Sequence, residues 1–319
     1  MSVSVDDPVA GAPPSGGNPQ GTLGGSAELE ARFAQLELQL GRSESADANP
    51  ARLGVCAMVV PGTSAREEPL PAEVTWRANE QFPAASTIKV FVLQSLMERV
   101  ALNQLSLDDE LEVHAADVVT GSGVLKTLTP GRGFLLRDLA TLMIVVSDNT
   151  ATNVLIDAVG LERINASIGR HGWSSTHLSG KLQVQRAASG SKPSPSLTSP
   201  ANLVDYFRRL WAGELLPPAL TATCQAIYRR QQVSELGRAL DYDPYSVELG
   251  VAPWRLASKS GSLRGVRNDA GVLEPLNGSP AMVMAVMSAG CPDERFHPEN
   301  LGARVVGLAA AAVHARLTL

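Results

Sequence analysis

Residues 86–102 read STIKVFVLQSLMERVAL and predict a helix that is apolar on nearly every side. Such a helix is buried in a folded protein, so we expect this segment at the centre of a domain. Ser86 opens the helix, and Lys89 follows one turn later on the same face. Burial lowers the pKa of a lysine, which would let Lys89 accept the proton of the Ser86 hydroxyl. The free N–H groups at the helix start also favour negative charge developing beside Ser86.

The elements expected around this helix fall into separate runs. Strand patterns occur towards both ends of the chain, whereas helical periodicity dominates the middle. Strands that do not alternate with helices predict an α+β fold, and short connections between the last three strands favour antiparallel pairing. The expected strands are 53–60, 73–79, 255–259, 269–273 and 281–288, and the other expected helices are 27–40, 137–146, 151–159, 161–169, 200–211, 218–230 and 300–317.

A second polar segment, Ser147-Asp148-Asn149, interrupts two strongly apolar helices. A hydroxyl at Ser147 could relay a proton to a leaving group. The Asn149 amide could bind a substrate carbonyl or orient Lys89, while Asp148 is better suited to holding the loop through backbone N–H groups. Taken alone, such a tripeptide is usually a plain turn with a helix cap.

A third segment, Lys259-Ser260-Gly261-Ser262, stands at the end of an expected strand. A strand edge that includes Ser260 could pair with an extended substrate through its main chain. The N–H groups of Ser262 and Ser86 could together form an oxyanion hole. Lys259 and Arg267 would then hold a substrate carboxylate, for which arginine is suited by its two parallel donors. Taken alone, a segment of this kind is usually a solvated strand end followed by a turn.

The order of the three segments carries more information than any one of them. Ser86 and Ser147 are 61 residues apart, and Ser147 and Lys259 are 112 residues apart. With the stretches 147–153 (SDNTATN) and 267–272 (RNDAGV), the chain resembles the class A serine β-lactamases and penicillin-binding proteins over residues 26–319. The resemblance implies a five-stranded antiparallel sheet flanked by helices, an adjoining all-helical lobe, and a site between them. We therefore expect an α/β lobe at about 26–80 and 250–319, and a helical lobe at about 81–249.

The chain departs from this family where a loop glutamate normally activates the deacylating water. No Asp or Glu occurs between Arg163 and Val204. Gln183 or Gln185 could position a water but cannot accept its proton near neutral pH, and His177 is a possible base by its intrinsic pKa. We therefore expect a β-lactam or a related amide or ester to acylate Ser86 readily and the acyl-enzyme to hydrolyse slowly. A D-alanyl peptidase or esterase, or a non-catalytic binder that signals by being acylated, remain alternatives.

Composition narrows the remaining possibilities. The net charge of −5 argues against nucleic acid or an anionic membrane as the main partner. The family resemblance implies a small-molecule substrate, a β-lactam or an acyl-D-Ala-like compound. The five histidines and three cysteines show no metal-ligand spacing, so no metal or other cofactor is expected. The cysteines are expected to be buried thiols, and a single disulfide among them is the alternative. Residues 1–25 predict a disordered Gly/Pro-rich leader without a signal peptide, so the sequence as written predicts a cytoplasmic protein, although the resemblance favours export. We also expect a monomer.

Overall fold

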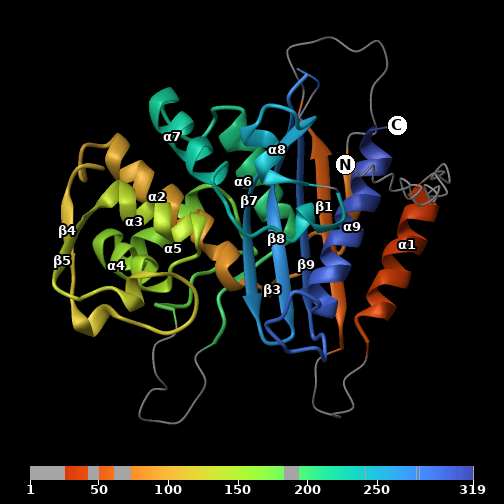
Figure 1. Ribbon diagram of the computed structural model, residues 1–319, viewed down its shortest axis with the longest axis horizontal. Helices are drawn as coiled ribbons and strands as arrows, with labels where there is room; N and C mark the ends of the chain where they lie inside the picture. Colours follow the sequence, from red (N-terminus) through yellow and green to blue (C-terminus); the bar gives the residue numbers. More distant parts are fainter. Residues whose placement is uncertain are drawn as a thin grey trace, which may run out of the picture.

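The computed structural model describes residues 26–41, 50–60, 73–182, 194–240, 242–277, 279 and 281–318, and the expected leader lies outside them. Its centre is a five-stranded antiparallel sheet in the order β2-β1-β9-β8-β7 (Figure 1). The α+β class and the antiparallel pairing are therefore confirmed. The strands are β1 (Arg52–Val59), β2 (Glu73–Trp76), β7 (Trp254–Leu263), β8 (Val266–Pro275) and β9 (Met282–Ala289).

Strands β7 and β8 extend further than the sequence pattern predicts. The expected strands were 255–259 and 269–273, but the ladder continues through Leu263 and begins at Val266. Polar side chains such as Asn268 and Asp269 interrupt the apolar pattern there, although both are fully buried. Lys259 consequently lies in the middle of β7 instead of at its end, and this correction places its whole tetrapeptide inside the sheet.

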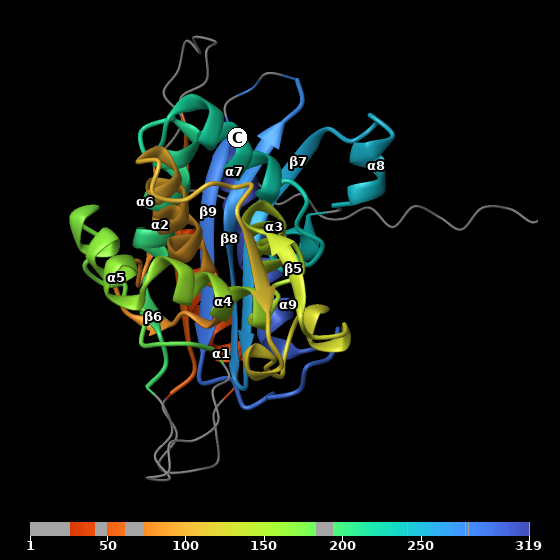
Figure 2. The same cartoon turned by 90° about the vertical axis from the view of Figure 1, so that its left-hand side faces the viewer.

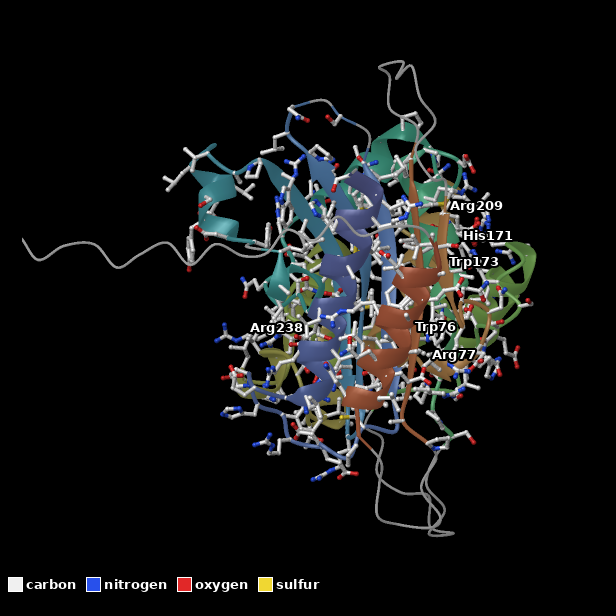
Figure 3. The ribbon with its side chains drawn as sticks, turned by 90° about the vertical axis from the view of Figure 1, so that its right-hand side faces the viewer. Trp76, Arg77, His171, Trp173, Arg209 and Arg238 are labelled. Carbon is white, nitrogen blue, oxygen red and sulfur yellow. The ribbon has the colours of Figure 1, made fainter. Side chains whose placement is uncertain are left out.

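Two helices cover one face of the sheet, α1 (Ser26–Gln39) and α9 (Leu301–Thr318), and they lie side by side in Figure 3. Leu29, Phe33 and Leu36 recur at spacings of four and three, so α1 turns one apolar stripe towards the sheet. Arg77 fixes α1 to the end of β2, because its Nε and Nη2 atoms donate to the two Glu37 carboxylate oxygens at 3.0 Å each.

The hydrophobic core beneath α1 and α9 is the smaller of two. The opposite face of the sheet carries α6 (Pro200–Trp211) and the other helices of the larger core (Figure 2). α6 lies against β1, β8 and β9, even though it falls within the range expected for the helical lobe. Ser199 accepts a hydrogen bond from the Asn202 N–H at 3.2 Å, which confirms the predicted helix start. The other helices on this side are α2 (Lys89–Ala101), α3 (Leu136–Val145), α4 (Asn149–Val159), α5 (Leu161–Arg170) and α7 (Pro218–Tyr228).

Several short elements escape the sequence prediction because they are too brief to show a period. The ends of the long loop expected at 173–199 are ordered, since the backbones of His177 and Leu197 pair as a bridge; residues 183–193 lie outside the described part. All three cysteines are free and buried, as predicted for thiols. The short elements are β3 (Phe82–Pro83) paired with β6 (Leu197–Thr198), β4 (Glu110–Val113) paired with β5 (Arg132–Leu135), α8 (Pro244–Glu248), and the 3₁₀ helices η1 (Ala85–Ile88), η2 (Ala115–Asp117), η3 (Leu125–Thr127) and η4 (Leu236–Ala239).

A polar and aromatic cluster connects the helical side to α6. Glu98 of α2 accepts hydrogen bonds from Ser167 at 2.9 Å and from His171 Nε2 at 2.6 Å. The His171 ring stacks on Trp173 with centroids 4.6 Å apart, and the guanidinium of Arg209 from α6 lies 5.8 Å from the Trp173 centroid (Figure 3). Because Glu98 lies on the same helix as Lys89, this cluster helps to hold that helix in place.

Candidate active site

Ser86 lies in η1, which leads directly into the buried helix α2. The preceding Ala85 has a φ of +50°, a conformation that costs about 1–3 kcal/mol for a residue with a side chain. The Ser86 side chain is partly exposed, whereas Thr87 and Ile88 are fully buried. The hydroxyl therefore stands at a strained turn, where it remains accessible to a substrate.

Strand β7 passes very close to this turn. A Cβ atom built on Gly261 would lie 2.8 Å from the backbone nitrogens of both Ser86 and Thr87. No residue other than glycine fits there without displacing main chain. The close approach brings the exposed edge of β7 beside the backbone N–H of Ser86, as an oxyanion hole shared with Ser262 would require.

Lys89 is fully buried and forms three hydrogen bonds through its Nζ atom. The acceptors are the Ser147 carbonyl oxygen at 2.8 Å, the Ser147 Oγ at 3.0 Å and the Asn149 Oδ1 at 2.9 Å. Burial lowers the pKa of Lys89 well below its usual value, the charge of Lys259 lowers it further, and Asp148 opposes the shift. The three contacts hold the Lys89 amine in place, while burial makes its ammonium group easier to deprotonate than that of an exposed lysine.

Lys259 reaches the same hydroxyl from the sheet. Its Nζ atom donates to Ser147 Oγ at 3.1 Å and to the Ser260 carbonyl oxygen at 2.6 Å. Burial lowers the pKa of Lys259 to about 7, against the opposing charge of Asp269. Ser147 itself has a φ of +53° and is partly exposed. Its Oγ accepts from two lysines, so its own proton is free to point elsewhere.

Asp148 and Asn149 hold the loop that follows η2. The Asp148 Oδ2 accepts from the Val124 N–H at 2.6 Å, and its Oδ1 caps α4 by accepting from Ala151. The Asn149 Nδ2 donates to the Thr120 carbonyl at 3.0 Å. The predicted loop-holding role of Asp148 is confirmed by these bonds.

The structure does not bring Arg267 together with this cluster. Residues paired across β7 and β8 share a face, so Arg267, opposite Ser262, lies on the face away from Lys259 and its partner Ala270. Its Nη1 donates to the Leu263 and Val266 carbonyls at 2.7 Å each, and its Nη2 donates to the Arg295 carbonyl. The guanidinium thus ties the β7–β8 turn to the segment before α9, and these contacts do not support the expected carboxylate-binding role.

Ser260 and Ser262 also occupy the even positions of β7, on that second face. β7 is the edge strand of the sheet, and no other strand of the described residues pairs with its outer side. Main-chain groups of β7 therefore remain for a substrate to pair with, and the expected contacts of this segment concern its backbone more than its hydroxyls.

Two asparagines that the sequence interpretation passed over hold the loop where an acid was expected. Asn153 of α4 binds both main-chain groups of Leu182, accepting from its N–H at 2.7 Å and donating to its carbonyl at 2.9 Å. Asn165 of α5 binds Leu178 in the same way, at 2.9 Å for each bond. Asn153 lies one helical turn beyond Asn149, the partner of Lys89, so the clamp on Leu182 is one turn of α4 away from the residue that binds the lysine. The sequence interpretation could have identified Asn153, because it is the last residue of the stretch 147–153 quoted above.

Of the remaining candidates for a water-activating group, His177 alone lies in the described part of the chain. Gln183 and Gln185 lie outside the described residues, and the exposed His177 is held only through its backbone bridge. In the described ranges no three His, Cys, Asp or Glu side chains gather as ligands for a metal ion. Nor does any helix in the described part of the chain have the length and hydropathy needed to cross a bilayer.

An antiparallel sheet beside a helical lobe, with a serine at a helix start and two lysines around a second serine, is typical of β-lactamases and penicillin-binding proteins. A model of the β-lactamase enzyme family matches residues 50–317, and the chain belongs to that family of β-lactamase-like serine hydrolases. The β-lactamase AST-1 of Nocardia asteroides is 31% identical over 279 residues, which cover 86% of this chain and 80% of the relative.

Solved structures show the same fold. A β-lactamase from Sphaerobacter thermophilus superimposes with a TM-score of 0.73 at 26% identity, covering 91% of this chain and 97% of the other. A mutant of PBP-A, solved as an acyl-enzyme complex with penicillin G, matches with a TM-score of 0.71 at 23% identity over 90% and 95% of the chains. Both β-lactamases and a protein named PBP-A thus share this architecture.

Proposed function

We propose that Ser86 is acylated by β-lactams or related amides and esters, and that the acyl-enzyme is hydrolysed slowly. The observation that carries this proposal is that Lys89, Ser147 and Lys259 are joined by hydrogen bonds one helical turn from Ser86, while the clamped loop position holds Leu182. Membership of the β-lactamase family supports a small carbonyl compound as substrate.

Acylation begins with removal of the Ser86 proton. The three hydrogen bonds of Lys89 use all three protons of an ammonium group, whereas the neutral amine has two protons and a lone pair. Loss of one proton therefore leaves a base one helical turn from Ser86, and its lowered pKa favours that form. Ser86 Oγ then bonds to the substrate carbonyl carbon, and the backbone N–H groups of Ser86 and Ser262 stabilise the oxyanion.

Cleavage of the carbonyl–nitrogen bond requires a proton on the leaving nitrogen. Ser147 Oγ accepts from both lysines, so its hydroxyl proton can be delivered to that nitrogen and replaced from a lysine. Lys259 uses two donors within the protein, which leaves its third for a substrate carboxylate. Asn149 positions Lys89 in this scheme.

Removal of the acyl group requires a base for water, and the loop provides none at its clamped position. The Leu182 side chain is aliphatic and partly buried, and no acid lies within nineteen residues before it or twenty-two after it. A peptidase or esterase that β-lactams merely inhibit would have the same site. That alternative predicts faster turnover of an acyl-D-Ala peptide or ester than of penicillin.

Intact-mass measurement during incubation with penicillin G tests the proposal. We expect a stable adduct of one penicillin on the wild-type chain and none on Ser86→Ala, whose unchanged thermal unfolding would show that the fold is intact. Ser95→Ala, a buried serine of the same helix α2, is the control and should still form the adduct. An adduct on Ser86→Ala, or fast turnover by the wild type without any lasting adduct, would contradict the proposal.

A further inference from the structure

A pocket lies far from the serine cluster, at the other end of strand β7. Its described lining joins the end of β1, the start of β7, the end of β8, the start of β9 and the last turns of α9, with a volume of about 220 Å³. Trp254 and Lys259 are five residues apart on β7, so the pocket and the site are about 17 Å apart along the strand. The proposed reaction makes no use of this cavity.

The walls of the pocket are apolar and aromatic. Val59, Leu273, Met282 and Leu317 contribute aliphatic surface, and Trp254 forms one flat side. The Trp254 ring stacks on Tyr242, with centroids 5.1 Å apart and planes tilted by 19°. This stacking fixes the Trp254 ring, so the wall is already arranged for another flat ring.

The polar groups of the pocket are few and uncharged. Its lining within the described residues contains no Asp, Glu, Lys or Arg side chain. His314 lies with its ring centroid 6.3 Å from that of Trp254, and burial lowers its pKa, so the imidazole is neutral at pH 7. Among the described residues no hydrogen bond reaches its ring nitrogens, which leaves one acceptor nitrogen for a ligand.

We propose that this pocket binds a neutral, flat aromatic molecule of one or two fused rings that carries a single N–H group, with His314 accepting the hydrogen bond and Trp254 stacking on the ring. The size fits, because a cavity of about 150 Å³ holds benzene and this one has room for a second ring. The absence of charge on the lining disfavours anions and cations, which would lose hydration without compensation.

Calorimetric titration of the full chain with indole and with 1-methylindole tests the proposal. We expect indole to bind about tenfold more tightly than 1-methylindole, which lacks the N–H group. His314→Phe keeps a ring but removes the acceptor and should abolish this tenfold difference. Val59→Trp should fill the pocket and weaken both compounds, which keeps the test decisive if His314→Phe does not fold.

Prior acylation of the wild type by penicillin G locates the binding. Indole should bind equally well to acylated and free protein, because the pocket and Ser86 are separate. Loss of indole binding on acylation would place the ligand at the serine site and overturn the inference. Equal affinities for the two indoles in the wild type, or no binding at millimolar concentration, would overturn it as well.

Discussion

The cluster around Ser147 and the loop around Leu182 are anchored at opposite ends of the same helical turn of α4 but are constructed differently. In the cluster, Lys89 from α2 and Lys259 from β7 both donate to the Ser147 hydroxyl, and Lys89 also donates to the Ser147 carbonyl oxygen and to Asn149 Oδ1, at 2.8–3.1 Å. In the loop, Asn153 and Asn165 bind only main-chain atoms of Leu178 and Leu182. In the proposed mechanism, acylation therefore depends on side chains that are fixed by burial, whereas deacylation depends on the side chain that the loop presents.

The largest effect is expected from Gly261→Ala, which changes the cluster. The new Cβ would lie 2.8 Å from the Ser86 and Thr87 nitrogens and force β7 away from the helix start. We expect the acylation rate with penicillin G to fall by about 10²–10³, the effect of losing an oxyanion-hole donor. Gly169→Ala on α5 meets no atom within 4 Å and is the matched control. Acylation by Gly261→Ala within tenfold of the wild-type rate would refute the assigned close approach.

A change in the loop should raise a reaction rate, whereas the change in the cluster lowers one. Leu182→Glu places a carboxylate where the Asn153 clamp fixes the backbone, so deacylation should accelerate by about 10²-fold, as expected for a positioned general base. Decay of the penicillin adduct followed by mass spectrometry gives this rate. Leu182→Gln has the same size without a basic group and should leave the rate unchanged. Equal rates in the two variants would show that residue 182 does not face the acyl group.

A smaller effect concerns the pH dependence of substrate binding by Lys259. Its pKa of about 7 means that the ammonium form, which attracts a carboxylate, is lost as the pH rises through 7. Between pH 6 and pH 8 the KM for a carboxylate-bearing substrate should rise by about tenfold, while the KM for a matched neutral ester stays constant. Lys259→Met should abolish the difference. A carboxylate KM that does not vary with pH in the wild type would contradict this role.

The smallest effect should appear in stability, at the Glu98 cluster that supports the lysine helix. Burial alone would raise the pKa of Glu98, but hydrogen bonds from His171, Gln94 and Ser167 outweigh it and lower the pKa to about 2. The resulting stabilisation is fully present above the unfolded-state pKa near 4.5 and is lost as the pH falls through 2. Glu98→Gln should cost about 2 kcal/mol of unfolding free energy at pH 7 in urea titrations, and less at pH 3. Equal costs at both pH values would exclude a charge-dependent contribution.

Much of the fold was predictable because long apolar periods decide where helices and strands form. The stretch 86–102, the helix start at Ser199 and the antiparallel C-terminal strands all followed from the pattern. The ends of β7 and β8 did not, since their buried polar residues interrupt the apolar alternation. The meeting of Lys89, Ser147 and Lys259 was expected only through the order of the motifs, because no local pattern brings together residues 112 positions apart.

The sequence was least informative where main-chain contacts decide the structure. The position of Arg267 depends on which face of β8 it occupies, and a strand of mixed polarity does not reveal that face in advance. Asn153 and Asn165 looked like ordinary helix residues, because a side chain that binds another segment's backbone has no recognisable spacing. The role of Gly261 likewise became visible only once the helix start lay against it.

The asparagine clamps have a consequence for how such a protein can change over generations. Asn153 and Asn165 recognise the peptide groups at residues 182 and 178, which every amino acid except proline possesses. The loop can therefore exchange its side chain at residue 182 while its path and anchoring energy stay nearly the same. Under the proposed mechanism, catalytic turnover and folding stability can therefore change separately, and one substitution at residue 182 would select between storing an acyl group and releasing it.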